Sequence, residues 1–178
     1  MIVRPATSAD AEAMAEIYGH NALHGAGTFE EAPPTPQEMA ARLQTVQARG
    51  LPWVVVEDEG RVLGFAYAGP YRLRSAYRYT AEDSVYVAPG AQGRGVGRAA
   101  LQRVIEACEA MGLRRLVAVI GDSANAGSVN LHRSLGFLPV GTLPDVGYKH
   151  GRWLDVVLMS RPLNGGSASA PGEGGLDL

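Results

Sequence analysis

The sequence contains very little cysteine and very little lysine. Cys108 is the one cysteine, which excludes an intramolecular disulfide and a cysteine-rich metal site. Because Cys108 falls within a helical pattern, we expect a small buried side chain and not a nucleophile. Lys149 is the one lysine among 16 basic residues, and the formal net charge of −2 offers no electrostatic footprint for nucleic acid or an anionic membrane. Any bound phosphate must therefore be held by a specific binding site and not by the overall charge of the protein.

Long apolar runs are also absent. None approaches the ~18 residues that a membrane span requires, and the first residues do not combine a basic region with an apolar core. We therefore expect a soluble cytoplasmic protein. The 178 residues suit one domain with a well-buried core, which we assign to residues 1–163. Residues 164–178 are rich in Gly and Ser, so we expect a disordered tail.

Hydrophobic periodicity and turn signals predict a mixed α/β order. Helices are expected over residues 10–24, 36–49, 96–111 and 126–135. Strands are expected over residues 1–5, 53–57, 61–68, 84–87, 116–120, 137–143 and 153–159. The second helix has a clear start, because Thr35 and Glu38 form a capping box around Pro36. This order predicts an α+β type of fold, with a mainly antiparallel central sheet and helices on both faces.

A glycine-rich segment, residues 87–98, leads from a predicted strand into a predicted helix. Such a turn lets successive backbone N–H groups point into one concavity, and the helix N-terminus adds its positive dipole end. The segment lacks the Gly-Lys-Ser/Thr ending of a P-loop, and Arg98 stands where a dinucleotide fingerprint needs its third glycine. We interpret the segment as a pyrophosphate cradle. The alternative is a glycine-rich connection without a ligand.

Two motifs in this order resemble those of the GNAT superfamily of N-acetyltransferases. Gln92-x-x-Gly95-x-Gly97 resembles the superfamily's pyrophosphate-binding signature. The residues Asn125, Ser128, His132, Gly136 and Phe137 follow the spacing of its second signature helix. The resemblance implies a GNAT fold and acetyl-CoA as co-substrate. The residues that it implies in acetyl-CoA binding are Val85, Tyr86, Val87, Gln92, Gly93, Arg94, Gly95, Val96, Gly97, Arg98, Asn125 and Ser128.

A narrower resemblance covers nearly all of the chain except the tail. The segments that carry it are residues 35–38, 66–70, 84–87, 117–121, 131–132 and 147–151. They look like the phosphinothricin N-acetyltransferase family. That family implies a cytoplasmic, commonly dimeric enzyme that acetylates the α-amine of phosphinothricin, methionine sulfoximine or methionine sulfone. The alternatives are a GNAT acting on another small amine or a protein N-terminus, and a non-catalytic acyl-CoA sensor.

The reaction needs a base, because an amino-acid amine is mostly protonated at neutral pH and cannot attack a thioester. Strand alternation places Glu82, Ser84 and Tyr86 on one face, which we expect to line the site. Glu82 also matches the glutamate that serves as base in the resembled family. Asp83 alternates to the other face, and we expect a surface carboxylate there.

The departing coenzyme A thiolate benefits from a proton donor. The superfamily commonly has a tyrosine at the position of His132. His132 can donate the proton, orient the substrate or hydrogen-bond within its helix, and these roles stay open. Tyr86 is an alternative donor, and at roughly 3.3 Å per residue it lies on the order of 13 Å along the strand from Glu82.

The acceptor's carboxylate or phosphinate suits arginine. If the chain after Pro70 is extended, Arg72 and Arg74 point the same way and can converge on one anion. Arg72, Arg74 and Tyr77 match substrate-contacting positions of the resembled family, and Phe29 matches another that supplies an apolar wall. The alternative is that these arginines are solvated surface charges. His20 and His24 share a helix face but lack a third ligand, so no metal is expected.

Overall fold

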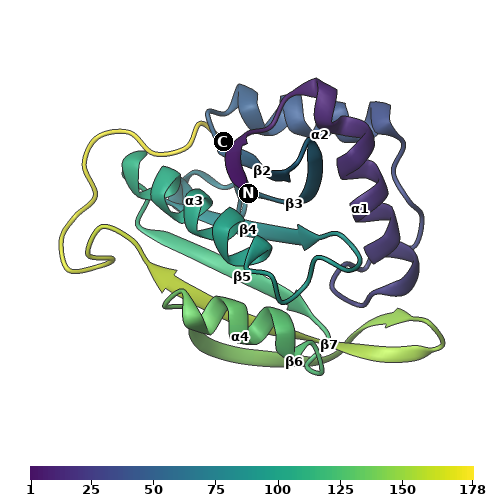
Figure 1. The fold of residues 1–178 in the computed structure, drawn as a ribbon. Helices are drawn as coiled ribbons and strands as arrows, with labels where there is room; N and C mark the ends of the chain where they lie inside the picture. Colours follow the sequence, from purple (N-terminus) through teal and green to yellow (C-terminus); the bar gives the residue numbers. More distant parts are fainter.

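The computed structural model describes residues 1–178, and a single seven-stranded sheet forms its centre, in the order β1-β2-β3-β4-β5-β7-β6 (Figure 1). The strands are β1 (Ile2–Pro5), β2 (Trp53–Asp58), β3 (Arg61–Pro70), β4 (Thr80–Val87), β5 (Arg115–Gly121), β6 (Leu138–Lys149) and β7 (Arg152–Pro162). The helices are α1 (Ala11–His24), α2 (Pro36–Ala48), α3 (Val96–Ala110) and α4 (Ala126–Ser134), with short 3-10 segments at Ser8–Asp10 and Ser75–Tyr77. The predicted elements are all present. None of the helices is long and apolar enough to cross a membrane.

The helices bury two hydrophobic cores, one on each face of the sheet. On one face α3 contributes Leu101 and Ile105 to the larger cluster, and apolar residues of α4 join it. On the other face α1 and α2 cover a smaller cluster that includes Met14, Met39 and Phe65. The predicted arrangement, with helices on both faces of a mainly antiparallel sheet, is confirmed.

The start of α2 shows how the sequence determines a helix end. The backbone N–H of Glu38 donates to Thr35 Oγ1 at 3.2 Å, and the N–H of Thr35 donates to Glu38 Oε2 at 2.7 Å. Pro36 opens the helix, where its missing N–H costs nothing. The capping box predicted from the sequence is therefore confirmed.

The one parallel pair in the sheet, β4 with β5, opens a gap. The register joins Thr80–Asp83 to Arg115–Ala118 and ends there. Beyond that point β4 stays paired with β3 and β5 stays paired with β7. The two strands therefore separate, and their facing edges carry backbone groups without a partner strand.

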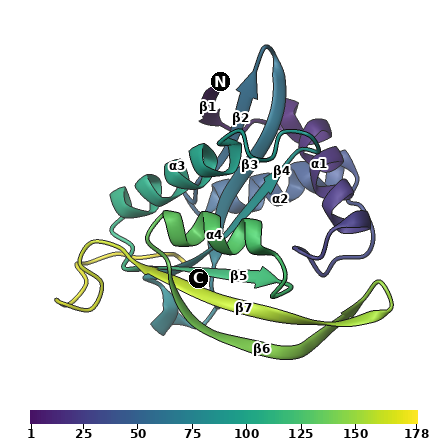
Figure 2. The ribbon, with the colours of Figure 1, turned by 60° about the horizontal axis from the view of Figure 1, so that its bottom comes forward.

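Several strands are longer than predicted, β4 and β6 among them. β4 begins at Thr80, before the predicted core at Ser84. β6 runs on to Lys149 and forms with β7 a long hairpin that projects beyond the sheet (Figure 2). Periodicity does not reveal this extension, because Pro144 and Gly147 are poor strand formers and the register shifts between Leu143 and Gly147.

The C-terminal tail contacts the body of the domain. Leu176 is 5 % exposed and joins the core beside α3, and its N–H donates to the carbonyl of Arg78 at 2.7 Å. The Arg114 side chain donates to the carbonyls of Gly166 and Ser169. Composition averages over the segment, so the sequence does not reveal this one buried leucine.

Candidate active site

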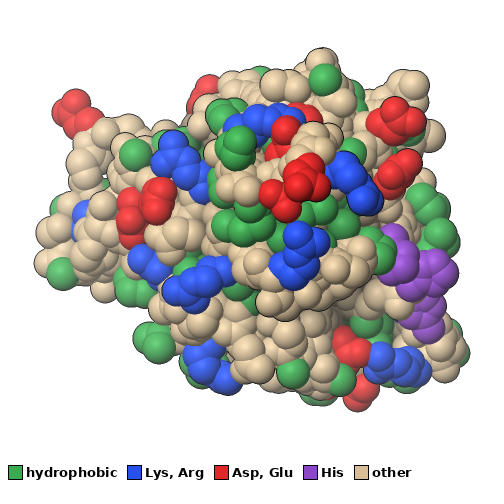
Figure 3. Space-filling view, in the orientation of Figure 1, with side chains coloured by type: hydrophobic (Ala, Val, Ile, Leu, Met, Phe, Trp, Pro, Cys, Tyr) green, Lys and Arg blue, Asp and Glu red, His purple; other side chains and the backbone are tan.

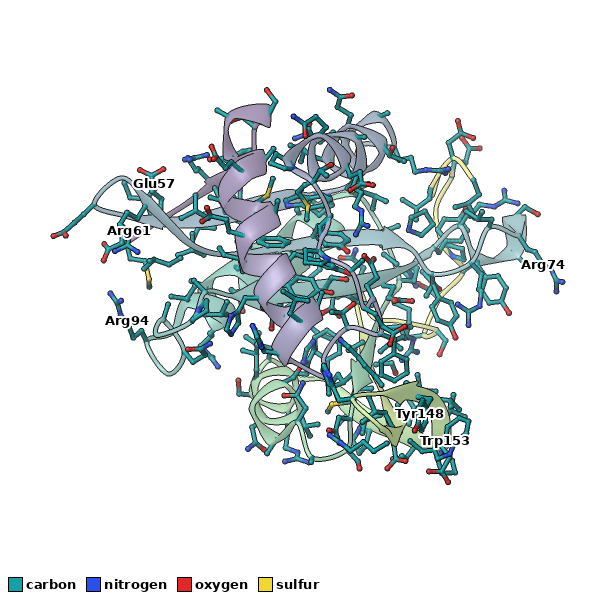
Figure 4. All side chains as sticks on the ribbon, turned by 90° about the vertical axis from the view of Figure 1, so that its right-hand side faces the viewer. Glu57, Arg61, Arg74, Arg94, Tyr148 and Trp153 are labelled. Atoms are coloured by element: carbon teal, nitrogen blue, oxygen red, sulfur yellow. The ribbon has the colours of Figure 1, made fainter.

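The gap between β4 and β5 is the mouth of a cavity of about 410 Å³. The facing residues of both strands, the glycine-rich loop before α3 and the inner side of α4 line it. The predicted acetyl-CoA residues that line the cavity are Val85, Tyr86, Val87, Gln92, Gly93, Gly95, Val96, Gly97, Arg98, Asn125 and Ser128. Arg94 does not line it, and instead pairs with Asp58 at 3.4 Å near the β2–β3 turn (Figure 4).

Backbone geometry shapes the anion-binding end of the cavity. Gly93 and Gly95 have φ of 74° and 83°, in the left-handed region that favours glycine. The turn ends at the N-terminus of α3, whose first N–H groups have no partner within the helix and carry the positive end of its dipole. A methyl group at Gly97 would meet Leu131 at 3.2 Å and Val87 at 3.3 Å. This end of the cavity fits a pyrophosphate held by backbone donors.

Strand alternation along β4 is confirmed. Val85 and Val87 pack against the α3 core, while Tyr86 faces α1 and its ring lies 4.7 Å from that of Tyr18. Burial, followed by the neighbouring Tyr67, raises the pKa of Tyr86 well above its ordinary value. The Tyr86 hydroxyl therefore stays protonated at neutral pH.

Glu82 lies on the same face of β4 as Tyr86 and is half-buried. Burial is the main cause that raises the pKa of its carboxyl; the charge of Asp83 adds to this and Arg72 opposes it. A second hollow has a volume of about 260 Å³. It is lined by Thr80, which precedes Glu82 on this face, and by Val117, which is the register partner of Glu82 on β5. Glu82 lines neither the cavity nor this hollow, but along β4 it lies between Thr80 of this hollow and Asp83 of the cavity.

The predicted acceptor residues lie on exposed loops. Tyr77 lines the second hollow. The Arg72 guanidinium lies 4.5 Å from the ring centre of Tyr71, whereas Figure 4 shows Arg74 pointing outward from the molecule. A shared anion site for both arginines stays a prediction. Phe29 is 38 % exposed and lies in the loop that joins α1 to α2.

The burial of Asp83 contradicts the expectation that it lies on the surface. It is not a surface carboxylate: it is 5 % exposed, and its Oδ2 lies 2.9 Å from Nε2 of His132. Asp83 shares a face with Val85 and Val87, and that face is covered by α3 and α4. The apolar neighbours at these alternate positions were a signal that this acid is buried and paired.

The ring of His132 is held at both nitrogens. Nδ1 lies 2.8 Å from the carbonyl of Ser128, and because a carbonyl only accepts, Nδ1 carries the proton of that bond. One further proton is then shared between Nε2 and Asp83. Burial opposes charge on His132, but the hydrogen bond and charge of Asp83 outweigh this and raise its pKa, while burial raises the pKa of Asp83. Both directions favour the protonated pair, and neither ring nitrogen of His132 is free to face the cavity.

The surface offers no metal site and no large patch of one charge on the face in view. Acidic and basic side chains are interspersed there, and histidines gather at one edge (Figure 3). The rings of His20 and His24 are 4.8 Å apart, but no group of three or more His, Cys, Asp or Glu side chains could hold a metal ion.

Known proteins share this architecture. The chain is 50 % identical over 169 residues to a phosphinothricin N-acetyltransferase of Alcaligenes faecalis, a match that covers 95 % of this chain and 86 % of the relative. It is 41 % identical to an L-methionine sulfoximine/L-methionine sulfone acetyltransferase of Salmonella typhimurium, with 92 % and 95 % covered.

A solved structure agrees closely with the fold. It is a GNAT superfamily phosphinothricin acetyltransferase from Sinorhizobium meliloti in complex with AcCoA, with a TM-score of 0.94, 46 % identity, and 98 % of this chain and 94 % of that chain covered. Residues 14–137 also match the family described as "Acetyltransferase (GNAT) family". The chain, with its cavity at the divergence of β4 and β5, belongs to the GNAT family of acetyltransferases.

Proposed function

We propose that this enzyme transfers the acetyl group of acetyl-CoA to the α-amine of small amino acids of the phosphinothricin, methionine sulfoximine and methionine sulfone type. The observation that carries the proposal is the place of Glu82, on one face of β4 between the cavity and the second hollow. The named activities of the relatives at 50 % and 41 % identity support the same acceptor class.

Acetyl-CoA fits the cavity at both ends. The loop from Gln92 to Gly97 offers backbone donors for the pyrophosphate. The unpaired edges of β4 and β5 offer backbone N–H and C=O groups for the amide-containing arm, much as a sheet edge binds an added strand. When bound, the co-substrate supplies the acetyl thioester at the narrow end of the gap.

Glu82 is the proposed base. The substrate arrives as an ammonium ion, and Glu82 accepts its proton directly or through a water molecule, which frees the amine to attack the thioester. Burial raises the pKa of the Glu82 carboxyl towards neutral pH, which makes its carboxylate a stronger base. The amine attacks acetyl-CoA in a ternary complex, because buried Cys108 has its pKa raised to about 12 and does not serve as a nucleophile.

The geometry favours Tyr86 over His132 as the group that meets the departing thiolate. The Nε2 atom of His132 faces Asp83, and its Nδ1 faces a carbonyl. Tyr86 lines the cavity and keeps its proton, so its hydroxyl can donate a hydrogen bond to the sulfur. In this proposal His132 and Asp83 hold α4 against β4 and do not transfer protons.

A second copy of the chain is the proposed partner, and the cytoplasm, where acetyl-CoA is supplied, is the proposed location. Tyr148 and Trp153 are opposite each other on the hairpin, with rings 5.3 Å apart and exposures of 61 % and 60 % (Figure 4). Further exposed apolar side chains on β6 are Leu138, Val140, Leu143 and Val146. Apolar surface gathered in this way marks an interaction site, which supports a homodimer.

A thiol-release assay tests the activity. Purified enzyme is mixed with acetyl-CoA and a panel of acceptors: methionine sulfone, phosphinothricin, a simple amine without a carboxylate, and a peptide with a free N-terminus. We expect release of the coenzyme A thiol with methionine sulfone and with phosphinothricin. We expect no release with methionine sulfone whose amine is already acetylated. Release with the peptide alone would assign the enzyme to protein N-termini. Binding of acetyl-CoA with no release for any acceptor would indicate a sensor.

A further inference from the structure

Lys149 is buried in a place where lysine is usually exposed. It lies near the tip of the β6–β7 hairpin, next to exposed Tyr148, yet it is only 3 % exposed itself. Its Nζ donates to the carbonyl of Gly25 at 3.0 Å and to the carbonyl of Thr28 at 2.8 Å. Because a buried ammonium is costly unless it is hydrogen-bonded, these two bonds account for its position.

The two acceptors lie at the ends of one turn in the α1–α2 loop. Gly25 follows the last residue of α1, where the negative end of the helix dipole favours a cation. Thr28 closes the turn, and its hydroxyl bonds the hydroxyl of Tyr18 at 2.9 Å. Burial lowers the pKa of Lys149, and the nearby acids Glu31 and Glu30 oppose this. The ammonium thus joins a segment near residue 25 to one near residue 149.

This turn is packed against the active site on its other side. Gly27 lines the cavity. The carbonyl of Ala26 lies so close to β5 that a Cβ at Gly121 would be 2.2 Å from it. The ring of Phe29 lies so close to β6 that a Cβ at Gly147 would be 2.2 Å from the ring. The loop therefore fits in one position, between Lys149 and the ends of β5 and β6.

We propose that Lys149 is a positioning residue that holds residues 25–29 beside the active site and so sets the place of Phe29 for the acceptor. It touches no reacting atom and acts through the loop. The hairpin that carries Lys149 presents Tyr148 and Trp153 on its opposite face. A second copy of the chain that packs on this face would therefore also fix the position of Lys149. Only the identity of the acceptor rests on the proposed function.

Steady-state kinetics of two variants test this positioning role. Lys149→Met removes the ammonium and keeps an unbranched chain, so two carbonyls lose a charged donor. We expect the KM for methionine sulfone to rise about ten- to hundredfold. We expect kcat at saturating acceptor and the calorimetric Kd for acetyl-CoA to change by less than about threefold. Lys149→Arg retains a cation and should restore part of the acceptor KM, which a purely structural loss would not predict.

Arg152→Met is the matched control. It removes a cation from the same hairpin, where Arg152 pairs with Asp122 and makes no bond to the α1–α2 loop. Its acceptor KM should stay at the wild-type value. A wild-type acceptor KM in Lys149→Met, or an equal rise in Arg152→Met, would overturn the proposal.

The wild-type protein offers a second measurement that needs no turnover and no variant. Lys149 is the one lysine of the chain, so the rate at which a small amine reagent modifies it reports how often the loop opens. We expect modification far slower than in the chain unfolded in urea. Modification at the unfolded rate overturns the positioning role. If methionine sulfone is not acetylated by the wild type, the acceptor proposal fails, while slow modification of the free enzyme still supports the positioning role.

Discussion

The proposed acetyl-CoA side and the proposed acceptor side of this site are built in different ways. Most of the cavity is formed by two stretches, residues 83–98 and 118–132, to which Asn21 and Gly27 add one edge, and its shape comes from backbone turns and diverging strands. The acceptor side combines exposed loops near residues 29 and 72 with a hairpin near residue 149, and side chains hold these segments together. The comparison shows that most of the cavity comes from one continuous part of the chain, residues 83–132, whereas the acceptor side depends on contacts between segments far apart in the sequence.

The largest expected effect tests the residue that joins the two sides. Glu82→Gln keeps the size of the side chain but cannot accept a proton, so kcat should fall by about 10²- to 10⁴-fold at pH 7. In the wild type the rate should rise with pH through the raised pKa of Glu82, because only the carboxylate acts as base. The variant should lose this step and recover partly at high pH, where free amine accumulates.

Stopped-flow or steady-state thiol release at several pH values measures this prediction. The acetyl-CoA Kd serves as the control and should stay near the wild-type value. Turnover of Glu82→Gln equal to that of the wild type at pH 7 would remove Glu82 from the base role.

The next effect concerns stability on the acetyl-CoA side. Asp83→Ala leaves His132 buried without its partner, which should cost about 3–5 kcal/mol of unfolding free energy. Replacing both residues by apolar ones, Asp83→Val with His132→Leu, should recover much of this loss, since no buried polar group is then unpaired. Urea unfolding measures both variants. A double variant that binds acetyl-CoA well but shows no turnover would indicate that His132 takes part in the reaction.

Cavity shape is tested by Gly97→Val. Its side chain meets Leu131 and Val87, which are already 3.2 Å and 3.3 Å from an added methyl group. Overpacking of about 1–3 kcal/mol corresponds to a loss of roughly five- to hundredfold in acetyl-CoA affinity. Gly141→Ala is the control, because a methyl group there meets no atom within 4 Å. Calorimetric affinity equal to that of the wild type in folded Gly97→Val contradicts the close-approach argument.

The smallest effect separates the two arginines of the acceptor side. Arg72 lies near Glu82 and stacks on Tyr71, so Arg72→Ala should raise the KM for methionine sulfone by about two- to fivefold, as expected for an exposed charge. Arg74 points outward and should matter less in one chain. The KM for a simple amine without a carboxylate should stay the same in both variants. Equal and large effects of both arginines would mean that they meet on one anion in the complete enzyme.

The acetyl-CoA side could be predicted from the sequence because its signals are local. The glycines at 93, 95 and 97 mark a turn into a helix, and Gln92 and Asn125 mark the two motifs. Alternation along β4 correctly placed Glu82 and Tyr86 on one face. These inferences needed only neighbours in sequence and the periods of helix and strand.

The remainder depended on contacts between distant segments. Asp83 was misplaced although Val85 and Val87 on the same face signalled burial, because its partner His132 lies far along the chain on α4. Lys149 received no role, since nothing near it in sequence shows that its ammonium meets the carbonyls of Gly25 and Thr28. Leu176 was hidden in a polar tail for the same reason. No periodicity encodes such partners, and only the folded chain brings them together.

The single parallel pair of the sheet has a consequence for folding. Hairpins such as β2–β3 close through a short turn, but β4 can meet β5 only after the chain has crossed over through α3. Closing that longer loop costs more chain entropy, so the cavity exists only when the central sheet is assembled. A ligand that binds this cavity recognises the native state and no partly folded one. We therefore expect acetyl-CoA, if it binds in this cavity, to stabilise the whole domain and to raise its melting temperature as its concentration rises.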